Sequence, residues 1–155
     1  MKEAVGMKAK NNMFLSFPSL SQNESFARQA VAAFALQVGD WTLSELDEIM
    51  TAVSEAVTNA IIHAYDQEIG EVRIRANILE GKGIEIFVED DGVGIPDIAL
   101  AMEPMFTTKP EQERTGMGFS FMESFMNELE VTSTPGHGTC VRMIKWLSAL
   151  PAPQE

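Results

Sequence analysis

The chain has 155 residues, 45% hydrophobic and 22% charged, which suits one domain with its own core. Its 11 Lys and Arg against 23 Asp and Glu give a formal net charge of −12, which disfavours direct nucleic-acid binding. The most apolar stretch, Ala30 to Val38, is too short to cross a membrane, and residues 1–13 do not resemble a secretory signal. The single Cys140 allows no internal disulfide, so we expect a cytoplasmic protein.

The first third of the chain predicts an arm, a strand and two helices. Residues 1–12 are polar and are expected to form a flexible arm, followed by a strand over 13–17 that ends at Pro18. Ser21 or Asn23 is expected to cap a helix that ends near Gly39. The apolar face assigned to that helix recurs every four residues, at Phe26, Ala30, Phe34 and Val38.

A capping box opens the second helix, because Thr42 is followed three residues later by Glu45. We expect this helix to run to about Tyr65. Its predicted core stripe has the helical period and consists of Leu46, Ile49, Val53, Val57 and Ala60.

Alternating residues predict two hairpins in the remainder. Residues 72–78 and 84–88 form the first, with a turn at 80–83, and residues 131–133 and 139–146 form the second. A helix is expected between them, over 119–128. The fold class predicted is therefore α+β, a two-layer α/β sandwich whose mostly antiparallel sheet is covered on one face by helices. This domain is assigned to residues 13–147, with a C-terminal tail over 148–155.

The first motif with possible chemistry is the pair Glu55 and Asn59 in the second helix. Residues four apart lie on the same face of a helix, about one turn from each other. An amide oxygen is a suitable neutral ligand for Mg²⁺, and a carboxylate can take a proton from an attacking hydroxyl. A solvated polar stripe would carry the same residue types, so the pair alone is weak.

Two glycine-rich segments follow. Asp90 stands at a strand end before Gly92 and Gly94, where a carboxylate can accept from a purine amine, although Asp-Gly is also an ordinary turn. Arg114 precedes Gly116-Met117-Gly118-Phe119 at the start of a helix, where exposed N–H groups suit phosphate oxygens. Between them, residues 104–114 contain Lys109 and Arg114, as a cover over phosphates would require.

The order of these motifs resembles the GHKL superfamily of ATP-binding domains. Glu55 to Asn59 is similar to the N box of that superfamily, Asp90 to Gly94 to its first glycine box, and Gly116 to Gly118 to its second. Gly138-Thr139 is similar to the Gly-Thr pair that occurs later in the chain of that superfamily and completes its adenine pocket. Segments such as 21–28, 53–63, 106–110 and 114–119 resemble more closely one branch, the anti-sigma F factors, serine kinases of endospore-forming bacteria.

The resemblance implies roles for particular residues. Glu55 would be the catalytic base, Asn59 the Mg²⁺ ligand, and Asp90 the reader of adenine in ATP or ADP, with Thr139 beside it. The phosphates would be held by Thr107, Thr108, Lys109, Arg114 and the backbone of Gly116, Met117, Gly118 and Phe119. Such mechanisms depend mainly on positioning and charge neutralisation.

The resemblance also implies partners. The expected protein is a homodimer that holds a sigma factor and phosphorylates its anti-anti-sigma antagonist on serine. Arg28 would contact these protein partners, and His63, one helical turn after Asn59, is expected to be structural or to line the pocket. A stress-response anti-sigma kinase, a sequestering module without turnover and a histidine kinase ATPase domain remain as alternatives.

Overall fold

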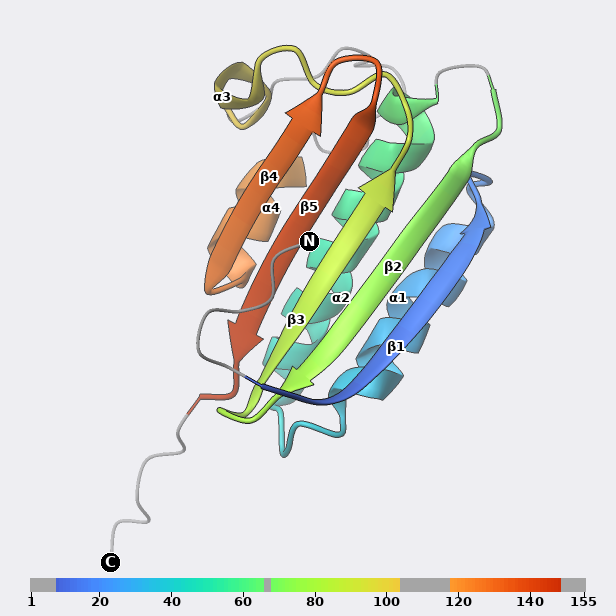
Figure 1. Ribbon diagram of the computed structural model, residues 1–155. Helices are drawn as coiled ribbons and strands as arrows, with labels where there is room; N and C mark the ends of the chain where they lie inside the picture. The colour runs from blue at the N-terminus through green and yellow to red at the C-terminus, as the bar shows by residue number, and fades with distance from the viewer. Residues whose placement is uncertain (1–7, 66–67, 104–117, 149–155) are drawn as a thin grey trace, which may run out of the picture.

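Five strands form one antiparallel sheet in the computed structural model, which describes residues 8–65, 68–103 and 118–148. In spatial order they are β1 (Ala9–Pro18), β2 (Glu71–Leu79), β3 (Gly83–Asp90), β5 (Gly138–Trp146) and β4 (Glu128–Thr134). Every neighbouring pair is antiparallel (Figure 1). The two predicted hairpins are confirmed as β2–β3 and β4–β5.

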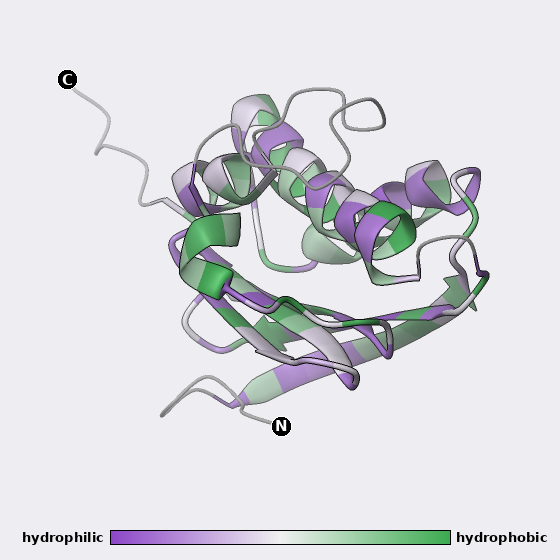
Figure 2. Cartoon of the chain, turned by 90° about the horizontal axis from the view of Figure 1, so that it is seen from above, coloured by the Kyte–Doolittle hydropathy of each residue, from purple (hydrophilic) through white to green (hydrophobic). Residues whose placement is uncertain are grey.

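The helices lie on one face of this sheet, as Figure 2 shows from above. They are α1 (Asn23–Ala35), α2 (Leu43–Asn59), the π-helix η1 (Ala60–Ala64), the short α3 (Ile98–Ala101) and α4 (Gly118–Phe125). The long α2 packs between α1 and α4. The predicted two-layer α+β sandwich is therefore confirmed. None of the described helices combines the length and apolar character needed to span a bilayer.

The core lies between α2 and the inner face of the sheet. Ile49, Val53 and Val57 of the predicted stripe are fully buried on α2, while Leu46 is only partly buried at its start. Alternate residues of β2 and β3 meet them, namely Val72, Ile74, Ala76, Ile84, Ile86 and Val88. Each buried Val or Ile side chain contributes about 1.5–3 kcal/mol of hydrophobic stabilisation. Because the core fills this face of α2, a functional site can use only the side chains on the rest of the helix.

The apolar face predicted for α1 is confirmed only in part, because Phe34 and Val38 pack against the core whereas Phe26 does not. The buried residues are Ala27, Val31 and Ala35, whereas Phe26 is 58% exposed. Small side chains on the inner face let α1 pack closely against α2, and this tertiary requirement outweighs the fourfold recurrence of larger residues. The predicted cap also differs, because Gln22 occupies the N-cap without a side-chain bond.

Other element boundaries move as well. Strand β1 begins at Ala9, four residues before the predicted start, and pairs with β2 as far as Pro18, with a register shift between Ala9 and Asn11. Residues 9–12 therefore belong to the sheet and not to the predicted arm. Helix α4 ends at Phe125, three residues before the predicted end, and Glu128 belongs to β4 instead. The α-helical part of the second helix ends at Asn59, and residues up to Ala64 form a π-helix.

The capping box that begins α2 is present in full. The Thr42 hydroxyl accepts from the Glu45 N–H at 3.0 Å, and the Glu45 carboxylate accepts from the Thr42 N–H at 3.0 Å. That second bond, the largest of several contributions, lowers the pKa of Glu45. The carboxylate therefore stabilises the helix above its ordinary pKa, and this contribution is lost as the pH falls through the lowered value.

Thr42→Ala removes one half of this box from the helix that carries Glu55 and Asn59. We expect the free energy of unfolding to fall by about 1 kcal/mol. For a chain of this size, that corresponds to a melting temperature lower by about 2–4 °C. Differential scanning fluorimetry measures the change, with Ser44→Ala in the exposed first turn as control. A melting temperature equal to wild type in Thr42→Ala would contradict the role of the box.

Candidate functional site

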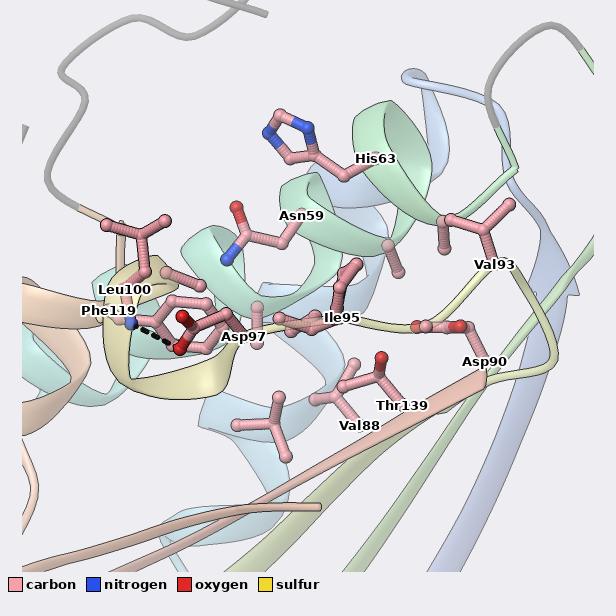
Figure 3. Close-up of a pocket in the computed structure, with 18 of the residues that line it drawn as sticks. Asn59, His63, Val88, Asp90, Val93, Ile95, Asp97, Leu100, Phe119 and Thr139 are labelled. Carbon is pink, nitrogen blue, oxygen red and sulfur yellow. Dashed lines mark hydrogen bonds between the residues drawn. The ribbon is translucent and has the colours of Figure 1, made fainter. Parts of the chain in front are cut away.

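A cavity of about 440 Å³ opens between α2–η1 and the ends of β3 and β5. The loop after β3 and the start of α4 close its sides (Figure 3). Its walls are mainly apolar, with contributions from Ala56, Ala60, Val88, Ile95, Phe119 and Val141. Polar groups at its edges come from Asn59, His63, Asp90, Asp97 and Thr139. A concave apolar slot with a few placed polar groups is typical of a small-ligand site.

Asp90 is the carboxylate at the inner end of the slot. It is only 8% exposed, and it accepts from the N–H of Gly92 at 2.9 Å and from that of Thr139. Burial, the largest cause, raises the pKa of Asp90 above its ordinary value, with the backbone bonds acting against it. Figure 3 shows the side chain directed into the cavity, where it can accept from a ligand N–H group.

Thr139 lies directly opposite Asp90 in the β3–β5 pairing. Its hydroxyl is 3.0 Å from the hydroxyl of Ser133, which donates to the carbonyl of Gly138 and accepts from the N–H of Ile95. Ser133 therefore fixes both the Thr139 hydroxyl and the loop that carries Ile95. Ser133 could not be identified from the sequence, because only the pairing of β4 with β5 brings it to the site.

The glycines of the first box are required by close packing of the backbone. A Cβ atom on Gly92 would lie 2.2 Å from the carbonyl oxygen of Ala64. Gly94 has φ +79°, and a Cβ there would lie 2.6 Å from the carbonyl oxygen of Thr134. Side chains at both positions would force the loop away from η1 and β4, and the cavity would lose one wall.

Tyr65 anchors the start of the same loop from the end of the helix. Its hydroxyl accepts from the N–H of Asp91 at 2.7 Å and donates to the carbonyl of Glu71 at 2.6 Å. Burial, the largest cause, raises the pKa of Tyr65, so the phenol stays protonated and can make both bonds. Tyr65 was predicted only as a helix end, and its link to the loop depends on long-range contacts.

The π-helix η1 places His63 and Ala64 at the cavity. A π-turn inserts an extra residue, and such turns occur frequently at functional sites. The carbonyl of Ala64 accepts from the N–H of Val93 at 2.9 Å, which joins the end of this helix to the glycine box. His63 lines the cavity on the helix side (Figure 3), one of the two roles that the sequence left open.

Glu55 and Asn59 meet the start of α4 at the other end of the cavity. A Cβ atom built on Gly118 would lie 3.3 Å from Asn59 Nδ2 and 3.4 Å from Glu55 Oε2. Asn59 lines the cavity, whereas Glu55 lines a neighbouring groove on the outer side of α2. The two side chains lie next to each other beside Gly118, as their spacing of four residues predicts, and the two hollows adjoin there.

The structure brings together Asn59, Asp90, Gly94, Gly118, Phe119 and Thr139, all of which line the cavity, with Gly92 in its loop. Arg28 lines the same groove as Glu55. Thr107, Thr108, Lys109, Arg114, Gly116 and Met117 lie outside the described residues. Val88 and Val141 were predicted only as strand residues, because alternation in β3 and β5 does not distinguish a packed position from a cavity lining.

Within the described ranges no group of three or more His, Cys, Asp or Glu side chains could hold a metal ion. The donor set nevertheless fits a hard ion that is bound mainly through phosphates and water, because such an ion needs only one or two protein oxygens. Asn59 can provide an amide oxygen at the cavity edge. The apolar slot that ends in the buried Asp90 fits an adenine ring.

Residues 17–145 match the family model of the histidine kinase-like ATPase domain. Among solved structures, the RsbU and RsbW domains of a Mycobacterium tuberculosis protein align with a TM-score of 0.66 at 17% identity, covering 91% of this chain and 34% of that one. A blue-light activated histidine kinase from Erythrobacter litoralis aligns with a TM-score of 0.54 at 25% identity, covering 83% of this chain and 42% of the other. The chain thus has a histidine kinase-like ATPase domain, a class that binds nucleotides.

The curated relatives narrow this class. An anti-sigma F factor of Caldanaerobacter subterraneus subsp. tengcongensis is 60% identical over 141 residues, covering 91% of this chain and 97% of the relative. One from Thermoanaerobacter pseudethanolicus is 57% identical over 143 residues, covering 92% of this chain and 99% of the relative. One from Bacillus velezensis is 52% identical over 140 residues, covering 90% of this chain and 94% of the relative. The chain belongs to the anti-sigma F factor family.

Proposed function

We propose that this protein is an anti-sigma factor that holds sigma F and that it is also an ATP-dependent serine kinase. Its phosphate acceptor is the anti-anti-sigma protein, which phosphorylation on serine inactivates. The observation that carries the proposal is the position of Glu55 and Asn59, which stand together where the apolar cavity meets the outer groove. A carboxylate there can serve an acceptor that approaches from outside the nucleotide cavity.

We propose one orientation for the nucleotide in the cavity. Asp90, with Thr139 beside it, accepts from the exocyclic amine of adenine at the inner end of the slot, while the ring packs against the apolar walls. The phosphates then extend toward Asn59 and the first turn of α4, where backbone N–H groups favour anions. Thr107, Thr108, Lys109, Arg114 and the backbone from Gly116 to Phe119 complete the phosphate site in this proposal.

ATP would supply the transferable phosphoryl group, and Asn59 would hold a Mg²⁺ ion, which would supply positive charge to the phosphate oxygens. Glu55 takes the proton from the serine hydroxyl of the acceptor. The serine oxygen bonds to the γ-phosphorus as the bond from that phosphorus to the bridging oxygen breaks, and ADP leaves. A carboxylate base contributes about 10²- to 10⁴-fold to such a transfer. Asn59 and Glu55 project from successive turns of one helix, so the metal ligand and the base keep a fixed separation.

The nearest alternative is an anti-sigma kinase of the stress-response type, which acts on a different sigma factor. Co-elution of the protein with the sigma F of its source organism, in the presence of ATP and Mg²⁺, distinguishes the two. We expect a stable complex with sigma F that contains two copies of this chain. A complex formed only with another sigma factor would favour the alternative.

Incubation with γ-labelled ATP and the anti-anti-sigma protein tests the kinase part of the proposal. We expect label on the acceptor, and phosphoserine after acid hydrolysis. Binding of nucleotide and partner without transfer of label would instead identify a module that sequesters its partner without turnover. Label on a histidine would assign the protein to the chemistry of histidine kinases.

A further inference from the structure

The groove beside Glu55 lies on the outer side of the helical layer. It has a volume of about 510 Å³ and is formed by α1, α2 and α4. Arg28 comes from α1, Asp47, Ser54 and Glu55 from α2, and Phe121 from α4. Because Glu55 also stands next to Asn59 and Gly118, this groove and the nucleotide cavity meet at its carboxylate. The groove is the outer approach to the proposed base.

Arg28 is the only Lys or Arg in α1, α2 and α4. In the groove it faces a surface that also contains Asp47 and Glu55, so it provides the only positive charge among the described lining residues. A guanidinium group has five N–H donors in a rigid fork. Its orientation therefore decides which acceptors of an entering segment it can bind.

Glu24, one turn before Arg28 in the same helix, contacts the guanidinium. Its Oε1 accepts from Ser54 Oγ at 2.8 Å and is 3.4 Å from Arg28 Nη1. The Glu24 side chain is 13% exposed and that of Arg28 is 35% exposed, so water screens this contact only in part. Ser54 is itself buried and immediately precedes Glu55 in α2. The carboxylate thus links the cation on α1 to the turn of α2 that carries the base.

We propose that Glu24 is a positioning residue for the phosphate acceptor. Its carboxylate, anchored by Ser54, holds the Arg28 guanidinium at the rim of the groove, where the guanidinium binds the serine-bearing segment of the acceptor protein. This inference rests on the proposed kinase function. Glu24 acts through Arg28 and touches neither nucleotide nor the reacting hydroxyl.

The variant Glu24→Gln separates positioning from a purely structural role. Glutamine retains an oxygen that can accept from Ser54 and so preserves the link between the helices, but it removes the charge that holds Arg28. We expect the KM for the anti-anti-sigma protein to rise by about five- to twentyfold. The kcat and the Kd for ADP should stay within about twofold, because Asn59 and Asp90 are unaffected.

A double-mutant cycle shows whether Glu24 acts through Arg28. In an Arg28→Ala background, we expect Glu24→Gln to change the KM by less than about twofold. Ser54→Ala should raise the KM as Glu24→Gln does, since it releases the same carboxylate. Gln29→Ala is the matched control, because it removes another i, i+4 side-chain bond on the exposed side of α1, to Ser25.

The outcomes are distinct. An unchanged KM in Glu24→Gln, or a full effect of that variant without Arg28, would overturn the inference while leaving the kinase proposal intact. A lower melting temperature with unchanged KM would assign Glu24 to helix packing alone. Failure of the wild-type protein to phosphorylate serine would instead refute the proposed function.

Discussion

Glu55→Gln is expected to lower phosphate transfer to the acceptor by about 10²- to 10⁴-fold, because the amide cannot take the proton of the serine hydroxyl. The substitution keeps the size of the side chain beside Gly118, so the cavity should be undisturbed. We therefore expect the Kd for ADP to remain within about twofold of wild type. Transfer is measured under single-turnover conditions, and nucleotide binding by titration calorimetry.

Asp47→Asn is the matched control for this experiment. Asp47 lines the same groove and carries the same charge, but it lies eight residues before Glu55 on α2 and does not line the nucleotide cavity. Its replacement removes a groove charge but not the proposed base, so we expect transfer to change by less than about threefold. Near wild-type transfer in Glu55→Gln would remove Glu55 from the mechanism.

Asp90→Asn is expected to weaken binding of ADP by about 10- to 100-fold, in the range of a lost charged hydrogen bond. The same change should raise the melting temperature of the nucleotide-free protein at neutral pH. Burial raises the pKa of Asp90, so the charged carboxylate costs folding free energy at neutral pH, and the neutral amide avoids this cost. A stabilised protein that has lost its ligand is the expected signature of a functional carboxylate.

The pH dependence of this effect has a definite sign. As the pH falls through the raised pKa, Asp90 becomes protonated in the folded protein and its destabilising effect disappears. The gap in melting temperature between Asp90→Asn and wild type should therefore narrow toward acidic pH. Over the same range the affinity of the wild-type protein for ADP should fall, because the neutral carboxyl accepts less well.

Asp91→Asn provides a comparison at the neighbouring residue, where the expected change in melting temperature has the opposite sign. Hydrogen bonds from Arg73, at 2.7 and 2.9 Å, lower the pKa of Asp91, so its charge stabilises the fold at neutral pH and the contribution is lost as the pH falls. We expect Asp91→Asn to lower the melting temperature slightly.

Destabilisation of the nucleotide-free protein by Asp90→Asn, or unchanged affinity of that variant for ADP, would contradict the assignment of Asp90.

Local patterns predict much of this fold. The alternation at 72–78 and 84–88 identifies β2 and β3, and the buried positions of α2 follow its helical period. The Thr42–Glu45 box marks the start of α2 to the residue. These features are local, because the side chains that create each pattern lie within one element. The motif residues Asn59, Asp90 and Thr139 also meet at one cavity, which their order in the chain alone does not require.

Features that depend on contacts between distant elements could not be predicted. The buried face of α1 is set by close packing on α2, and Phe26 is exposed although its spacing favours the core. The π-helix at 60–64 forms where Ala64 meets the loop of Val93. Ser133 becomes relevant only through the register of β4 on β5. In each case a long-range contact determines what the local sequence leaves open.

A crystal structure with Mg²⁺ and a non-hydrolysable ATP analogue tests the central claim most directly, namely that the cavity orients a nucleotide from Asp90 toward Glu55. We predict the adenine amine at hydrogen-bond distance from the Asp90 carboxylate. The metal should be bound through the Asn59 oxygen, with the terminal phosphate next to Glu55 at the head of the groove. A nucleotide bound outside the cavity, or inside it with its terminal phosphate away from Glu55, would contradict the account.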